Sequence, residues 1–129
     1  MLDYPNDARD VSFAAFAGLI EPPEKLTPTQ WCERNFVVPD GPRAGEKWSA
    51  ELTPYICEPL DNMGADAPCN EQAIRKSAQT GFTIMAIGGV GYSIDCDPQG
   101  GILLCQPTDG ALDDFLRDKL NPAIENSPA

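Results

Sequence analysis

The residues of this chain best suited to ligand binding or catalysis lie in one short stretch, residues 75–83. This stretch follows the pattern of a phosphate-binding loop, G-x-x-x-x-G-K-S/T, with two departures. Lys76 stands at the position of the first glycine, and Phe82 replaces the lysine that follows the second glycine, Gly81. Thr83 fills the Ser/Thr position. A loop that folds as this pattern implies would bind a nucleoside triphosphate together with magnesium.

Each position of such a loop has a physical task. Backbone N–H groups between the end of a strand and the start of a helix point into one hollow and hold phosphate oxygens. Gly81 lets the backbone approach the phosphates closely, and the Thr83 hydroxyl would bind Mg²⁺. A cation must also neutralise the phosphates, and here only Lys76 or its neighbour Arg75 can reach them from the upstream side. An ordinary strand, polar turn and helix would have a similar local sequence, so that alternative stays open on the loop alone.

The helices around this loop are predicted from capping residues and apolar spacing. Thr27, Pro28 and Gln30 form a capping box with proline in the first turn, which predicts a helix start. The other helices are predicted from apolar residues that share one face and, after the loop, from a run of apolar and small residues. The predicted helices cover residues 7–20, 27–35, 53–60, 84–94 and 109–120.

Prolines and threonines set the expected ends of the later helices. Thr53 caps the helix of residues 53–60, and Pro59 should shorten or kink it. Thr108 should cap the helix of residues 109–120, and Pro122 should interrupt it, leaving one last turn near residues 123–124.

Two strands are expected beside the loop, at residues 71–74 and 101–106. The second is continuously apolar, which is typical of a strand buried on both faces of a parallel sheet. The order strand, helix, strand, helix predicts parallel strands with a right-handed crossover. Two strands do not make a stable parallel sheet. The expected fold class is therefore α/β, an incomplete P-loop NTPase sheet of the RecA/helicase type with N-terminal helices.

Length and charge exclude several classes of protein. The chain has 129 residues, enough for one domain or a piece of one, and a net charge of -11. A compact nucleic-acid binder usually carries a basic face, so we do not expect this segment to grip DNA by itself. The sequence contains no run of 18 apolar residues and no basic N-terminal region of a signal peptide. These features predict a soluble intracellular protein.

The five cysteines do not suggest a metal site or a nucleophile. They include no C-x-x-C pair, and the chain has no histidine that could serve as a ligand or as a base. We expect reduced, mostly buried thiols.

The chain resembles the large terminase subunit of lambda-type tailed phages, the ATPase and nuclease that packages DNA into capsids. The resemblance runs from residue 26 to residue 128, and the order and spacing of its blocks are more specific than the loop alone. The matching residues are Trp31, Asn35, Pro39, Trp48, Thr53 to Tyr55, Lys76 to Thr83, Gln106 to Thr108, Phe115, Asn121, Pro122, Ser127 and Pro128.

This resemblance implies a deviant Walker A motif whose lysine, Lys76, stands at the start of the loop. Members of this family carry an aromatic residue in or near the position of Phe82, so Phe82 agrees with the family pattern. The region of Trp48 and of Tyr55 would lie near adenine, and Gln106 to Thr108 would couple the ATP site to DNA. The implied cofactors are ATP and Mg²⁺, with Lys76 as the catalytic residue and Thr83 as the magnesium ligand. The implied nucleotide-binding residues are Lys76, Ser77, Ala78, Gln79, Thr80, Gly81, Phe82, Thr83 and Tyr55.

The resemblance also implies a domain division and a set of partners. The apolar pattern of residues 7–20 predicts an N-terminal helical segment at residues 1–25, and the resemblance implies that residues 26–129 form the N-terminal part of the ATPase domain. The Walker B strand and the nuclease domain would lie beyond Ala129, so we expect this segment alone to be inactive in ATP hydrolysis. The implied partners in the host cell cytoplasm are ATP, double-stranded DNA, the terminase small subunit, the portal of the procapsid and further copies in the motor, with no membrane.

Two other functions remain compatible with the sequence. One is a non-catalytic interaction fragment, such as a prophage remnant, because no acidic strand is present. The other is a different P-loop NTPase such as a helicase or a small-molecule kinase, against which Phe82 argues because a lysine should precede Thr83.

Overall fold

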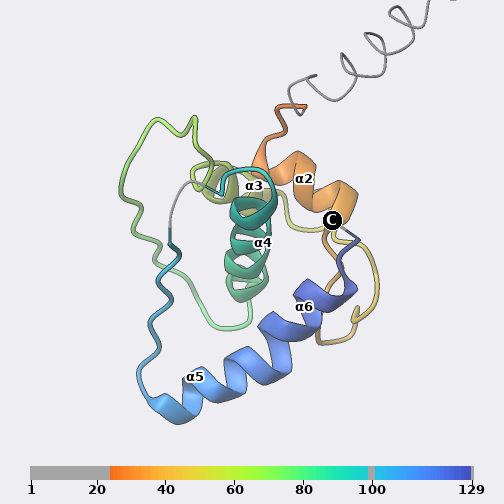
Figure 1. Cartoon of the computed structure of the whole chain (residues 1–129), viewed down its shortest axis with the longest axis vertical. Coiled ribbons are helices and arrows are strands. Elements are labelled where there is room, and N and C mark those ends of the chain that lie inside the picture. The colour runs from red at the N-terminus through yellow and green to blue at the C-terminus, as the bar shows by residue number, and fades with distance from the viewer. Residues whose placement is uncertain (1–23, 99–100, 129) are drawn as a thin grey trace, which may run out of the picture.

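A computed structural model describes residues 24–98 and 101–128 of the chain (Figure 1). The helix expected at residues 7–20, and almost all of the N-terminal segment of residues 1–25, lie outside the described residues. Figure 1 shows α4 in the middle of the molecule, with α2 and α3 near one end and the run from α5 to α6 crossing near the other. Both α2 and α3 pack against α4 and against each other.

The first described helix, α2, spans Pro28–Asn35 and begins as its capping residues predict. The backbone N–H of Gln30 donates to Thr27 Oγ1 over 3.3 Å, and the Gln30 side chain accepts from the Thr27 N–H over 3.1 Å. This capping box satisfies two donors that a helix start leaves without partners. The capping prediction at Thr27 is confirmed.

The second described helix, α3, spans Pro54–Asp61 and differs from its prediction in two details. Thr53 occupies the N-cap position, but its side chain makes no capping hydrogen bond, and its buried Oγ1 has no partner among the described atoms. Pro59 lies inside the helix, which continues for two residues beyond it. The expectation that Pro59 shortens the helix is therefore wrong, because Pro59 removes a hydrogen bond only near the C-terminal end.

The central helix, α4, spans Phe82–Asp95. Its glycines let neighbouring side chains approach closely. A Cβ on Gly88 would lie 2.8 Å from Cys32 Sγ, and a Cβ on Gly91 would lie 2.6 Å from Trp31 Cη2. The glycines of α4 therefore lie at its contact with α2. At 14 residues it is too short to cross a membrane, and the same holds for every other helix in the described ranges.

The C-terminal helical run is continuous, which corrects the expected break at Pro122. It comprises α5 (Asp109–Phe115), the π-helical turn η1 (Leu116–Leu120) and α6 (Asn121–Asn126). In the π turn, the N–H of Asn121 bonds to the carbonyl of Leu116, five residues back. A proline lacks an N–H and clashes with the preceding turn, and the wider π turn accommodates Pro122 in the first turn of α6.

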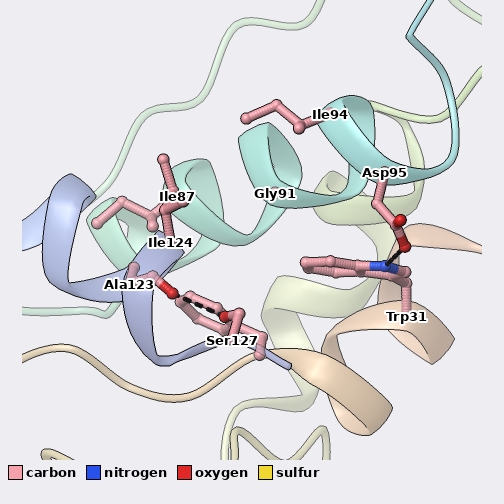
Figure 2. Close-up of a pocket in the computed structure, with 9 residues that line it drawn as sticks. Trp31, Ile87, Gly91, Ile94, Asp95, Ala123, Ile124 and Ser127 are labelled. Atoms are coloured by element: carbon pink, nitrogen blue, oxygen red, sulfur yellow. Dashed lines mark hydrogen bonds between the residues drawn. The ribbon is translucent and has the colours of Figure 1, made fainter. Parts of the chain in front are cut away.

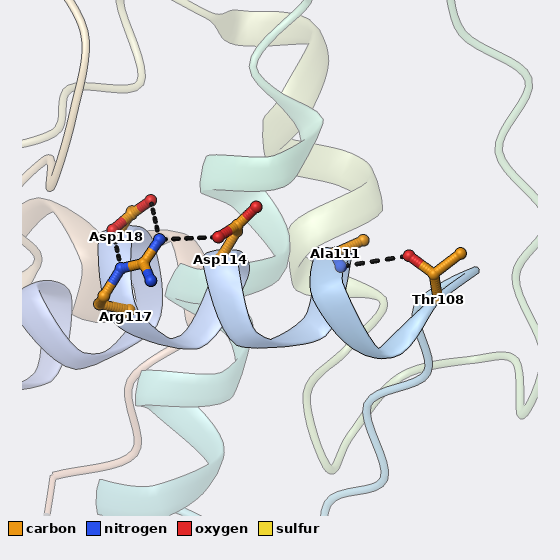
Figure 3. Close-up of polar contacts among 5 residues, drawn as sticks. All are labelled: Thr108, Ala111, Asp114, Arg117 and Asp118. Carbon is orange, nitrogen blue, oxygen red and sulfur yellow. Dashed lines mark hydrogen bonds and ion pairs between the residues drawn. The ribbon is translucent and has the colours of Figure 1, made fainter.

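Local hydrogen bonds hold the start of this run. The N–H of Ala111 donates to Thr108 Oγ1 over 3.2 Å, so the predicted cap at Thr108 is confirmed (Figure 3). Further along, the guanidinium of Arg117 contacts Asp114 over 2.7 Å and Asp118 over 2.8 Å. These ion pairs are exposed to solvent and therefore add little to stability.

The predicted parallel sheet does not form within the described residues. Neither residues 71–74 nor residues 101–106 pair with another strand, and the β-pairing that the structure describes is an isolated antiparallel bridge between Val37 and Lys47. Leu103, expected to be buried on both faces of a sheet, is 88% exposed. A parallel strand needs neighbours on its edges and helices on its faces, and neither segment has them here. The α/β expectation is unconfirmed, and the described part is helical.

The core lies between α2, α3 and α4. Trp31, Ile56 and Leu60 are almost completely buried at its centre. The buried apolar residues are Trp31, Cys32, Phe36, Val38, Trp48, Ile56, Leu60, Met85, Ile87, Tyr92 and Ala123.

The cysteines depart from their expected burial. All five are free, but Cys69, Cys96 and Cys105 are exposed, and only Cys32 is fully buried. Burial raises the pKa of the Cys32 thiol to about 12, because a thiolate would lose its hydration there. The sequence predicted buried thiols from average behaviour, whereas Cys105 is exposed because the strand that would have buried it does not form.

Candidate functional site

The predicted phosphate-binding stretch forms a compact turn that leads directly into α4. Gly81 is the N-cap of α4 and has a left-handed backbone, with φ +79° and ψ 1°. Gln79 also has a positive φ, +56°, which is unusual for a residue with a side chain. The Thr80 hydroxyl donates to the Ser77 carbonyl over 3.1 Å and closes the turn. The helix thus starts where the pattern predicts, although no strand precedes the turn.

The start of α4 has the electrostatics of an anion site. No side chain caps this helix, and its first turn contains no acidic residue. The first backbone bond of the helix runs from the N–H of Met85 to the carbonyl of Gly81 over 3.1 Å. The amides of the first turn therefore lack partners within the helix, and the helix dipole favours a negative charge beside them.

The first turn of α3 supports this loop from one side. The hydroxyl of Tyr55 donates to the Thr80 carbonyl over 3.2 Å, and the rings of Tyr55 and Phe82 lie 6.3 Å apart between centroids. A Cβ on Gly81 would lie 3.2 Å from Ile56 Cδ1, so the glycine backbone packs directly on that side chain. Two consecutive residues of α3 therefore contact two consecutive residues of the loop.

The candidate charged and metal-binding groups lie on the surface. Lys76 and Arg75 are exposed, and neither forms an ion pair with a residue in the described ranges. Thr83 is also exposed, in the first turn of α4. Ser77, Ala78 and Gln79 are exposed, whereas Thr80, Gly81 and Phe82 are half-buried against α3. Within the described residues, no cluster of three or more cysteine and carboxylate groups could hold a metal ion.

A hollow of about 250 Å³ lies beside the loop, and Gly81 forms part of its lining. Trp48, Ile56 and Ile84 form apolar parts of its wall, and the unpartnered Thr53 lies there too. The hollow brings the Trp48 region of the sequence next to the loop. Sequence reasoning missed the contact between Ile56 and Gly81, because periodicity marks Ile56 only as a core residue and does not say what it touches.

A second hollow, of about 180 Å³, lies between α2, α4 and α6, toward the other end of α4 (Figure 2). Trp31 forms one wall, and its Nε1 donates to Asp95 Oδ2 over 2.7 Å. Ile94 and Ile124 line its opening, and Ser127 bonds back to the Ala123 carbonyl over 2.7 Å. This hollow is apolar and contains no residue of the predicted nucleotide site.

Residues Gln106 to Thr108, which the resemblance associates with coupling to DNA, lie at the start of α5. Thr108 uses its hydroxyl as the helix cap, and Gln106 is half-buried. The structure does not bring this segment into hydrogen-bond contact with residues 76–83.

The comparisons with known proteins agree on one family. The model of the ATPase domain of the phage terminase large subunit gpA matches residues 43–129, which include the loop and Tyr55. The terminase large subunit of Enterobacteria phage P21 is 32% identical over 108 residues, and that of Escherichia phage lambda is 30% identical over 108 residues. Each match covers 83% of this chain but only 16% of the relative. No solved structure matches the chain significantly.

The family model covers about two thirds of the chain, and both relatives agree with it over most of the same residues. The chain therefore belongs to the phage terminase large subunit family, and residues 43–129 belong to its ATPase domain.

Proposed function

We propose that this chain binds ATP with Mg²⁺ at the start of α4, as the ATP-binding part of a viral DNA-packaging terminase large subunit. One observation supports this proposal above the others. The uncapped N-terminus of α4, led by Gly81, falls inside the matched ATPase domain and coincides with the deviant Walker A pattern. A helix start without a capping side chain offers free amides for phosphate oxygens.

Each candidate residue has a task in this proposal. Backbone amides of residues 77–83 hold phosphate oxygens, and the Lys76 ammonium neutralises them from the upstream side. Magnesium, when bound, would offset the charge of the β and γ phosphates, with the Thr83 hydroxyl as its protein ligand. Ser77 and Gln79 lie at the edge of the turn, within reach of the nucleotide. The exposed ring of Tyr55 lies where a base could stack.

The remaining proposals concern the longer protein that such a segment serves. The relatives are named terminase large subunits, and the chain spans about a sixth of their length. We propose that the full-length form couples ATP hydrolysis to DNA translocation into a capsid and cuts DNA. Its partners would be double-stranded DNA, the small subunit, the portal and further copies of itself in the host cytoplasm. The present segment would bind ATP without efficient turnover.

Binding of MgATP to this chain, measured by calorimetry for the wild type and for Lys76→Ala, tests the proposal. Loss of one charge-assisted contact to phosphate corresponds to about 1.5–3 kcal/mol, so we expect the affinity to fall about 10- to 100-fold. Lys25→Ala removes the same charge far from the loop and should leave the affinity unchanged. Arg75→Ala tests the neighbouring cation and should weaken binding only slightly, through the general field.

Three results would contradict the proposal. Absence of MgATP binding by the wild-type chain would remove the proposed function. Equal affinity of the wild type and of Lys76→Ala would remove the assignment of the lysine. A large loss of MgATP affinity in Arg75→Ala, with no loss in Lys76→Ala, would show that Arg75 neutralises the phosphates instead of Lys76.

A further inference from the structure

We propose that Tyr55 is a positioning residue whose hydroxyl fixes the peptide between Thr80 and Gly81, so that the Gly81 N–H faces the phosphates. This inference rests on the proposed function of the loop and adds a residue that sets its geometry. The Tyr55 ring could contact a base independently of this role, because the ring and the hydroxyl are separate parts of the side chain.

The orientation follows from the geometry of one peptide group. The Tyr55 hydroxyl donates to the Thr80 carbonyl over 3.2 Å, so this carbonyl points toward the first turn of α3. The peptide is trans, since the described residues contain no cis bond. In a trans peptide the carbonyl and the following N–H point in opposite directions. The Gly81 N–H therefore points away from α3, toward the open side of the loop.

A second contact keeps the same peptide in place. The backbone of Gly81 packs on Ile56, which is 1% exposed and therefore enclosed by other side chains. The ring of Tyr55 also lies against that of Phe82, at 6.3 Å between centroids. These apolar contacts hold the loop against α3 but do not choose which way the carbonyl points. The hydroxyl of Tyr55 sets the direction of the carbonyl, and a substitution can remove this hydroxyl without disturbing the packing of the ring.

The loop needs such support because it has little of its own. Residues 71–79 are exposed, and no strand holds the upstream side of the turn. Gln79 has a positive φ, which a residue with a side chain adopts only when its surroundings require it. The Thr80 hydroxyl bonds only within the turn, to Ser77, so it does not anchor the turn to another element.

The test compares Tyr55→Phe with the wild-type chain, using magnesium tripolyphosphate and adenosine as separate probes. The variant keeps the ring and loses only the hydroxyl. We expect tripolyphosphate affinity to fall about two- to tenfold, the range for one hydrogen bond, while adenosine affinity stays constant. Tyr92→Phe is the matched control, because it makes the same change on a buried residue of α4 that lies far from the loop.

A second measurement needs no ligand. The residual dipolar coupling of the Gly81 N–H, which reports the direction of that bond, should change in Tyr55→Phe, while the couplings within α4 stay the same. An unchanged coupling of the Gly81 N–H would overturn the inference, and so would unchanged tripolyphosphate affinity. A loss of adenosine affinity alone would overturn it too, in favour of a base contact. If the wild type binds no tripolyphosphate, the proposed function fails, and the coupling of the Gly81 N–H still decides whether Tyr55 sets the orientation of this peptide.

Discussion

Replacing Gly81 with alanine should destabilise the chain for two separable reasons. The backbone there has φ +79°, a left-handed conformation that costs a residue with a Cβ about 1–2 kcal/mol. The new Cβ would also lie 3.2 Å from Ile56 Cδ1, closer than an ordinary contact. Because Ile56 is almost fully buried, relieving this contact requires a shift in the core, which adds about 1 kcal/mol. We therefore expect a total loss of about 2–3 kcal/mol in the free energy of unfolding.

Gly41 provides a matched control for the backbone contribution. Its φ is +88°, and a Cβ there would meet nothing within 4 Å. Gly41→Ala should therefore cost about 1–2 kcal/mol from the backbone alone. The difference between the two variants measures the contact with Ile56.

A double-mutant cycle isolates the same contact. Ile56→Val removes Cδ1, at a cost of about 0.5–1.5 kcal/mol by itself. In the background of Ile56→Val, the effect of Gly81→Ala should shrink by about 1 kcal/mol, because the close contact no longer exists. Urea unfolding followed by tryptophan fluorescence gives all four free energies, provided that the m-values agree. Equal losses for Gly81→Ala and Gly41→Ala, together with an additive cycle, would refute the packing of the loop on α3.

Two further predictions concern the contact between α2 and α4. Gly91→Ala should lower the free energy of unfolding by about 1–3 kcal/mol, because its Cβ would lie 2.6 Å from the rigid indole of Trp31. In Gly89→Ala the Cβ meets the flexible end of the Met63 side chain, so the melting temperature of this variant should lie near that of the wild type. A Gly89→Ala variant that is less stable than Gly91→Ala would contradict the helix packing. The wild type should lose stability relative to Cys32→Ala above pH 9. There the unfolded thiol ionises, while the buried thiol, with a pKa of about 12, stays protonated. The unfolded wild type then binds fewer protons than the folded protein. The free energy of unfolding of the wild type, relative to that of Cys32→Ala, should therefore fall by about 1.4 kcal/mol per pH unit between pH 9 and 12. Urea unfolding of both proteins at pH 8 and 10.5 measures this fall. A difference in free energy of unfolding that stays constant between the two pH values would contradict the burial of Cys32.

Local sequence predicts well where the helices of the described residues begin. Two helix starts are predicted from capping contacts between residues that are close in the sequence, one at Thr27 with Gln30 and one at Thr108. The structure confirms both. The position of Gly81 likewise predicts the start of α4. These features depend on neighbours in the sequence, which a pattern can read directly.

Features that depend on distant residues could not be predicted in the same way. Residues 101–106 have the composition of a buried strand, but a parallel strand forms only where other strands pair with it. The described residues offer no such partner, so Leu103 is exposed. The continuity at Pro122 depends on a π turn that no simple pattern marks. The support of the loop by Tyr55 and Ile56 is a tertiary contact between segments about 25 residues apart.

Binding of a triphosphate at the turn before α4 can be observed residue by residue in a titration of the chain with MgATP, followed by backbone amide chemical shifts. The largest changes should occur at the amides of residues 77–83, and in Lys76→Ala the same changes should need about 10- to 100-fold more MgATP. Changes confined to the apolar hollow between α2, α4 and α6, or to residues outside the turn, would contradict it.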